Sequence, residues 1–201
     1  MFQCYGNYIE SFIYIFERMF MRKRKLILIF FPLILGITIY LLYRSRNLFY
    51  FKILHTTFLK DPILQVRTFA RIYRKFFSTW FVYSLPDGLW LFSFGAALLI
   101  DRIFYFYNFV VFTSIFIFMI LIEFLQLFLG GHGTFIGTFD KADLLCFTLG
   151  YLSIVLISNF IHKSNKPDKK LFTFENKKKE FFYNIKTIVI FAILGVLPSL
   201  F

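Results

Sequence analysis

Three carboxyl groups and one amide occur at the ends of apolar segments, where such side chains are uncommon. Glu123 and Gln126 lie near the end of one apolar run, and Asp140 and Asp143 open the next one. An ionised side chain at the centre of a bilayer costs roughly 2.5–3.5 kcal/mol on insertion scales, so an acid at membrane depth indicates a functional site by default. Such groups can bind a polar ligand, or they can exchange protons with a substrate.

The composition indicates that these residues belong to an integral membrane protein. Apolar residues make up 59% of the 201 positions, 33 positions are Phe, and the mean hydropathy is +0.69. A single soluble core could not bury this much apolar surface. The sequence therefore predicts an all-α, polytopic bundle of transmembrane helices. Its net charge of +12 does not indicate a nucleic-acid partner, because the aromatic residues lie in apolar runs and are not interleaved with basic residues.

Apolar runs of about 20 residues mark the predicted spans, since a helix of that length crosses roughly 30 Å of hydrocarbon. About five spans are predicted, at residues 26–43, 88–100, 106–128, 144–161 and 188–201. The last run is short and contains Pro198. It either crosses the membrane or enters it without crossing.

The predicted spans divide the chain into two parts. Residues 1–25 carry apolar side chains at helical spacing together with basic residues, and we expect an amphipathic helix lying in the membrane interface. Residues 26–201 form one transmembrane helical domain, with a Lys-rich loop at 162–186. The two cysteines, Cys4 and Cys146, fit neither a metal-site spacing nor a disulfide framework, and we interpret both as structural.

The distribution of Lys and Arg favours a cytoplasmic amino terminus. With five spans, the amino-terminal segment and the second and fourth loops share one side and hold 14 of the 23 basic residues. The first loop, on the opposite side, is also basic. Its Arg67, Arg71, Arg74 and Lys75 fit the polar face of an amphipathic helix that could bind anionic head groups, although a solvated basic connector fits equally well.

The same threading brings the polar residues to one face of the membrane. The second span begins, the third ends and the fourth begins on that face. The candidate ligand-binding residues occur at these three places: Asp87, Glu123, Gln126, Asp140 and Asp143.

Glu123 is expected to lie deepest in the membrane. If its helix leaves the hydrocarbon near Gly130, at the start of a glycine-rich turn over residues 130–133, Glu123 lies roughly 10 Å below the interface. Gln126 follows three residues later and shares its helix face. Simpler roles are also open, because aspartates cap helix amino termini and a Glu/Gln pair can join helices by hydrogen bonds.

The sequence contains no recognised catalytic motif. If the protein is an enzyme, Glu123 and Asp140 are the candidates for its acid and base, and the catalytic residues are otherwise unknown. No serine has the glycine-flanked setting of a nucleophile elbow, and no histidine has a second ligand at a metal-site spacing. We therefore predict no cofactor and no metal site.

The order Glu-x-x-Gln, turn, Asp-x-x-Asp, with Gly150 further along, resembles the signature of VanZ-like membrane proteins over about residues 85–161. In that family the Glu/Gln pair and the acidic turn are the recurrent polar positions, matched here by Glu123, Gln126, Asp140 and Asp143. The chain lacks an Arg before Asp140, and residues 85–88 and 137–140 look closer to a branch of small bacterial membrane proteins. The resemblance implies an inner-membrane protein whose relatives are linked to glycopeptide antibiotic resistance.

From these features we expect a non-enzymatic cell-envelope protein that recognises a lipid or glycolipid head group. Its expected partners are membrane lipids, lipid-linked cell-wall components or anionic head groups. One alternative is a membrane-embedded acid/base enzyme acting on a lipid-linked substrate, with or without a divalent cation held by oxygen ligands. A proton-coupled transporter is the less favoured alternative, because it would need polar residues through the full membrane depth.

Overall fold

A computed structural model describes residues 2–44, 56, 60–130, 138–165 and 171–196, with residues 2–22 described by their backbone alone. These residues form helices and no strand, which confirms the predicted all-α class. The predicted glycine-rich turn falls largely outside the described residues, as does the end of the predicted fifth span. The side chain of Cys4 is also not described, whereas Cys146 is buried and not in a disulfide.

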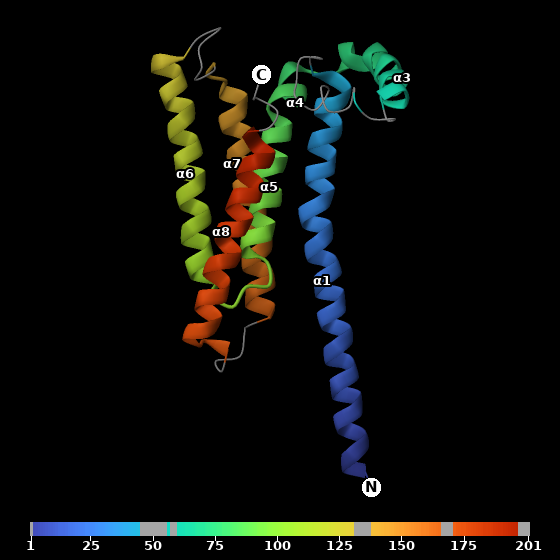
Figure 1. The fold of residues 1–201 in the computed structure, drawn as a ribbon, viewed down its shortest axis with the longest axis vertical. Coiled ribbons are helices and arrows are strands. Elements are labelled where there is room, and N and C mark those ends of the chain that lie inside the picture. Colours follow the sequence, from blue (N-terminus) through green and yellow to red (C-terminus); the bar gives the residue numbers. More distant parts are fainter. Residues whose placement is uncertain (1, 45–55, 57–59, 131–137, 166–170, 197–201) are drawn as a thin grey trace.

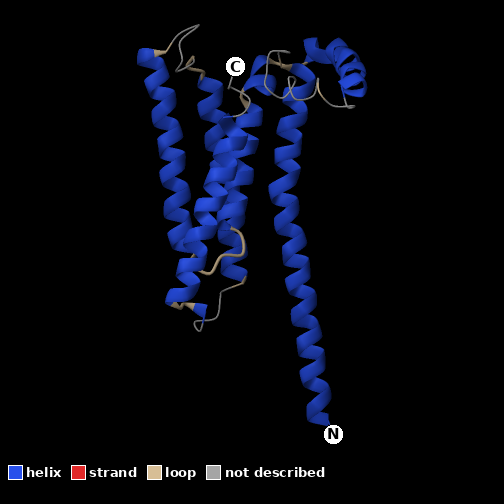
Figure 2. Ribbon diagram, viewed as in Figure 1, coloured by secondary structure: helices blue, strands red, loops and turns tan. Residues whose placement is uncertain are grey.

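Five long helices lie side by side in the structure (Figures 1 and 2). They are α1 (Phe2–Tyr43), α5 (Leu85–Leu99), α6 (Tyr105–Leu129), α7 (Lys141–Ser164) and α8 (Phe174–Val196). The upper end of the bundle in Figure 1 is where α5 and α7 begin and α6 ends, and the lower end is where α6 and α8 begin. Short helices α3 (Lys60–Ile72) and α4 (Thr79–Tyr83), with the 3₁₀ turn Tyr73–Phe76, lie between α1 and α5 in the chain.

Helix α5 is the centre of the bundle, because it packs against α1, α6, α7 and α8. It is apolar on all sides, as expected for a helix surrounded by other helices. Leu91, Phe94 and Leu98 are almost fully buried, and small residues such as Ala96 and Gly95 allow neighbouring helices to approach. The outer helices instead expose large apolar side chains around the bundle, which is typical of surfaces that contact lipid.

Among the described residues, three helical segments are long and apolar enough to cross a membrane: Lys23–Tyr43, Tyr105–Leu129 and Lys141–Ser164. They correspond to the predicted first, third and fourth spans. Helix α5 matches the predicted second span but has only 15 residues. The predicted count of about five spans is therefore confirmed only for these three.

The first half of α8 corrects the predicted loop at residues 162–186. Helix α7 continues to Ser164 and α8 already begins at Phe174, so residues 162–164 and 174–186 of the predicted loop are helical. Residues Glu180, Asn184, Thr187 and Phe191 recur at helical spacing and are all buried. The lysines of this segment led to the prediction of a loop. The buried helix face formed by these four residues was not predicted from the sequence.

The amino-terminal segment is not a separate element. Residues 2–25 continue into the first predicted span as one 42-residue helix, which extends beyond the lower end of the bundle in Figure 1. The predicted interfacial helix is therefore not confirmed.

The position of Arg67 contradicts the prediction that this residue lies on the polar face of an amphipathic helix in the first loop. Its side chain is 1% exposed and donates hydrogen bonds to the carbonyl oxygens of Leu41 and Arg44. Carbonyls in the last turn of a helix have no partner within that helix, and a cation there also interacts favourably with the helix dipole. Arg67 therefore fixes α3 to the end of α1 and does not present its charge to a head group.

A proline kink joins α4 to α5. Ser84 between them keeps helical backbone angles and donates its N–H to the Trp80 carbonyl at 2.9 Å. Pro86 has no N–H to donate to Val82, so the helix is interrupted here. The kink places Ser84 and Asp87 at the upper end of the bundle.

Helices α5 and α7 approach each other through two glycines. A Cβ atom on Gly88 would lie 2.6 Å from the carbonyl oxygen of Cys146, and one on Gly150 would collide with the carbonyl oxygen of Gly88. Small residues of this kind allow helix backbones to pack closely in membranes.

We predict that Gly150→Ala destabilises the protein by about 1–3 kcal/mol, because the new methyl group must push the two backbones apart. Gly36→Ala is the matched control. A Cβ atom on Gly36 would lie 3.4 Å from the backbone oxygen of Pro86, which is an ordinary van der Waals contact. Alanine also has a higher helix propensity than glycine. Thermal unfolding in detergent should show a lower midpoint for Gly150→Ala alone. Equal midpoints would contradict this account of the packing.

Candidate functional site

The candidate site lies at the upper end of the bundle, where the start of α5, the end of α6 and the start of α7 meet (Figure 1). The carboxylates of Asp87, Glu123 and Asp143 come from these three helices and lie within electrostatic reach of one another. Residues separated by up to 56 positions in the chain are thus neighbours in the structure.

Glu123 is the most buried acid of this group, with 6% of its surface exposed. The backbone amide of Asp140 lies against its carboxylate. Within the described part of the chain, its Oε2 atom is buried and has no hydrogen-bond partner, and the same holds for Oε1 of Gln126. A buried acceptor without a partner costs about 1–3 kcal/mol or more, so two of them close together favour a ligand that donates hydrogen bonds.

Asp87 faces helix α1. The hydroxyl of Tyr40 donates a hydrogen bond to Asp87 Oδ1. The guanidinium of Arg44 lies 4.3 Å from the centre of the Tyr40 ring and within electrostatic reach of both Asp87 and Asp143. Tyr40 and Arg44 were missed by the sequence analysis, which placed no part of the site on the first span. Their signal in the sequence was a tyrosine in the last turn of an apolar helix and an arginine directly after that helix.

Asp140 and Asp143 occupy the first turn of α7. Asp140 is exposed, and its Oδ1 accepts a hydrogen bond from the Ala142 N–H at 2.9 Å. This is the simpler capping role considered from the sequence, and it is confirmed. Asp143 is partly exposed and lies against Ser84 at the kink between α4 and α5.

The site has more negative than positive groups. Asp87, Glu123, Asp140 and Asp143 surround it, and Arg44 is the cation that interacts with two of them. The carboxylates repel one another, so a cation or a hydrogen-bond donor placed among them is stabilised. In the described residues, no group of three or more His, Cys, Asp or Glu side chains is arranged to hold a metal ion.

An apolar cavity of about 390 Å³ adjoins the acidic cluster. Helices α1, α5, α6 and α8 contribute most of its wall, for example through Leu33, Trp90, Met119 and Ala192. Asp87 and Tyr40 also line it. A cavity of this size, with an apolar wall and a few polar groups, is typical of a small-ligand site.

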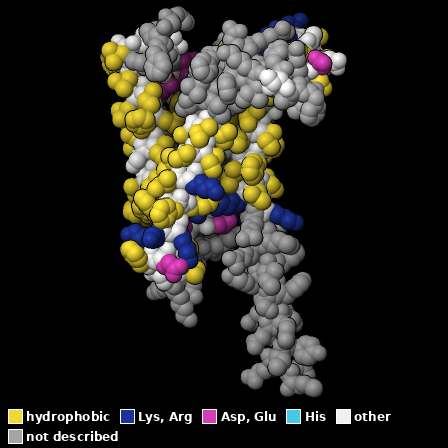
Figure 3. Space-filling view, viewed as in Figure 1, with side chains coloured by type: hydrophobic (Ala, Val, Ile, Leu, Met, Phe, Trp, Pro, Cys, Tyr) yellow, Lys and Arg dark blue, Asp and Glu magenta, His cyan; other side chains and the backbone are white. Residues whose placement is uncertain are grey.

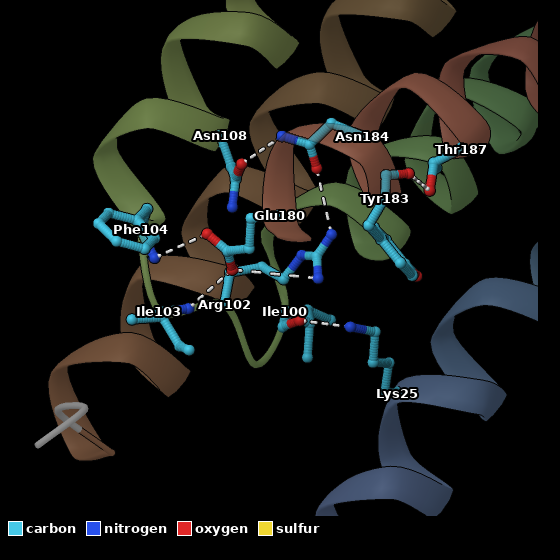
Figure 4. Close-up of polar contacts among 10 residues, drawn as sticks. All are labelled: Lys25, Ile100, Arg102, Ile103, Phe104, Asn108, Glu180, Tyr183, Asn184 and Thr187. Atoms are coloured by element: carbon cyan, nitrogen blue, oxygen red, sulfur yellow. Dashed lines mark hydrogen bonds and ion pairs between the residues drawn. The ribbon is translucent and has the colours of Figure 1, made fainter. Parts of the chain in front are cut away.

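A second polar cluster, shown in Figure 4, lies at the lower end of the bundle. The carboxylate of Glu180 accepts hydrogen bonds from the N–H groups of Ile103 and Phe104, at 3.0 and 3.1 Å. It also forms an ion pair of 4.0 Å with Arg102. Burial lowers the pKa of Arg102, while Tyr183, Glu180 and Asp101 oppose that shift, and a guanidinium keeps its proton near neutral pH.

The amides of α8 and α6 extend this lower cluster. Arg102 donates to Asn184 Oδ1 at 3.1 Å, and Asn184 donates in turn to Asn108 Oδ1 at 2.6 Å. Lys25 of α1 donates to the carbonyl of Ile100 at 2.7 Å, at the end of α5 (Figure 4). In this cluster the buried acid is paired with a buried base, so the arrangement is that of a structural joint between helices.

No family model, curated protein or solved structure matches this chain. The resemblance to VanZ-like proteins therefore remains a prediction from the motif.

We predict that Glu180→Ala destabilises the protein by roughly 3–5 kcal/mol, since it leaves Arg102 buried without its acidic partner. Glu175→Ala is the matched control on the same helix, because Glu175 is exposed and its ion pair is with the exposed Lys179. Thermal unfolding and limited proteolysis within α8 should respond to the first substitution and not to the second. If both variants were equally stable, the lower cluster would not hold α8 in place.

Proposed function

We propose that this chain is a multi-pass membrane protein of VanZ-like type that binds the head group of a lipid or glycolipid at the upper end of its bundle. The observation that carries the proposal is the buried, unpartnered Oε2 of Glu123 beside the carboxylates of Asp87 and Asp143. An acid at this depth with one oxygen atom unpartnered is costly, and a ligand that supplies a donor would remove that cost. The motif of Glu123, Gln126, Asp140 and Asp143 supports the proposed VanZ-like type, and with it a role in glycopeptide resistance.

The proposed ligand donates hydrogen bonds at this site. Both unpartnered atoms, on Glu123 and Gln126, are acceptors. A head group with hydroxyl or ammonium groups complements them. An anionic head group would be repelled by three carboxylates at this site, so the proposed ligand is not anionic there.

We propose further that all five long helices cross the bacterial inner membrane, with the amino terminus in the cytoplasm. Helices α4 and α5 together cover residues 79–99, about 31 Å of helix, which is enough for the hydrocarbon. Figure 3 shows hydrophobic side chains over the body of the bundle, several Lys and Arg side chains toward its lower end, and others at the top near α3. The positive-inside rule supports a cytoplasmic lower end and a site at the opposite face.

Glu123→Gln should weaken lipid retention about tenfold or more, because hydrogen bonds to charged groups contribute roughly 1.5–3 kcal/mol. The substitution keeps the shape of the side chain. Lipids that co-purify from native membranes can be quantified by mass spectrometry, with Glu175→Gln as a control at the other end of the bundle. Full lipid retention by a normally expressed Glu123→Gln protein would overturn the proposed function.

The proposed threading predicts that Lys141 and Lys178 lie on opposite sides of the membrane. Single cysteines at these two exposed positions, in a Cys4→Ser, Cys146→Ala background, can be labelled with an impermeant maleimide. We expect Lys141→Cys to react from outside intact cells and Lys178→Cys to react only in inverted vesicles. Labelling of both from the same side would rule out the five-span arrangement.

A further inference from the structure

We propose that the ligand is a lipid with an ammonium-bearing head group, and that one of its acyl chains occupies the cavity between α1, α5, α6 and α8. This inference rests on the proposed head-group site and names the class of lipid that it takes. The acidic cluster would hold the ammonium group, and the adjoining cavity would hold the chain.

The cavity fits the apolar part of such a ligand. Its wall is formed by aliphatic and aromatic side chains, including Leu33, Ile115 and Phe118, and its volume is about 390 Å³. Leu33 and Tyr40 are seven residues apart on α1, so this wall extends roughly 10 Å along the helix. Both α1 and α6 are long and apolar enough to cross a membrane. The cavity between them then lies at the depth of the hydrocarbon, where acyl chains are the surrounding molecules.

Asp87 connects the cavity with the acidic cluster. It lines the cavity beside Tyr40, and it also lies within electrostatic reach of Glu123 and Asp143. Ile122, the residue before Glu123, lines the cavity as well. A lipid whose acyl chain lies in the cavity would therefore have its head group next to the carboxylates.

The charge of the cluster favours an ammonium group over a neutral hydroxyl. Three carboxylates come together, and the nearby Arg44 is also engaged with the rings of Tyr40 and Tyr83, at 4.3 and 5.5 Å. A cation among like charges in a poorly solvated site gains more electrostatic energy than a neutral donor does. An ammonium group also offers up to three donors for acceptors such as Glu123 Oε2 and Gln126 Oε1.

The position of the tryptophans provides a direct test. The chain has two, and Trp90 lines this cavity whereas Trp80 lines a different cleft, between α5 and α7. A Trp80→Phe protein in phosphatidylglycerol vesicles leaves Trp90 as the fluorescent reporter. Brominated acyl chains quench tryptophan on contact, so they report whether a chain lies in the cavity.

We expect brominated phosphatidylethanolamine to quench Trp90 at a several-fold lower mole fraction than brominated phosphatidylglycerol or brominated diglucosyl diacylglycerol. Asp87→Asn and Glu123→Gln, which keep the shape of each side chain, should remove this difference. Ala192→Phe, which fills part of the cavity, should reduce quenching by all three lipids. Its matched control is Ile193→Phe, because Ile193 is exposed on the same helix and does not line the cavity.

Other results would overturn the inference in distinguishable ways. Preferential quenching by the glucosyl lipid would reject the ammonium head group and keep the proposed head-group site. Equal effects of Ala192→Phe and Ile193→Phe would reject the cavity as the place of the chain. If no lipid were preferred and Glu123→Gln retained all its co-purified lipid, the proposed function itself would fail.

Discussion

The close approach of α5 and α7 at Gly88 and Gly150 is the constraint on which the upper end of the structure depends. Backbone meets backbone there, with no room for a Cβ atom. Gly88 follows Asp87, and its contact on α7 is Cys146, one turn after Asp143. Because the two backbones touch, these aspartates are brought within electrostatic reach, although like charges would otherwise separate. The helix packing therefore supplies the free energy that keeps the acidic cluster together.

The buried acid at the lower end of the bundle has partners that balance its charge, whereas the buried acid at the upper end does not. At the lower end, Glu180 meets Arg102 and two backbone N–H groups, so its charge is balanced by neighbouring groups. At the upper end, Glu123 meets further carboxylates and keeps one oxygen atom without a partner. A buried ion pair adds little net stability but is costly to break, which suits a joint that fixes α8. A cluster of like charges lowers the stability of the fold unless a ligand binds to it. This is the property expected of a binding site.

The sequence predicted the parts of this arrangement that depend on composition and threading. The all-α class, three of the spans and the shared end of Asp87, Glu123 and Asp143 followed from long apolar runs joined in alternating directions. It could not predict the parts that depend on which helix face is buried. Tyr40 reaches Asp87 only because α1 packs on α5, and no local pattern encodes a contact 47 residues away. For the same reason, Arg67 was predicted on a polar helix face and the first half of α8 as a Lys-rich loop, although Arg67, Glu180 and Asn184 are buried.

Helix α1 contacts both ends of α5, and this fixes one wall of the cavity. Lys25 donates to the carbonyl of Ile100, directly after α5, and Tyr40 donates to Asp87 in the first turn of α5. Lys25 and Tyr40 are 15 positions apart, and Asp87 and Ile100 are 13 positions apart, so the two contacts span similar lengths of helix, about 20–22 Å. The two helices run in opposite directions, so the two contacts stay in register without bending either helix. Since Tyr40 also lines the cavity, a head group that took over its hydrogen bond to Asp87 would loosen α1 at the upper end, while Lys25 would still hold it at the lower end.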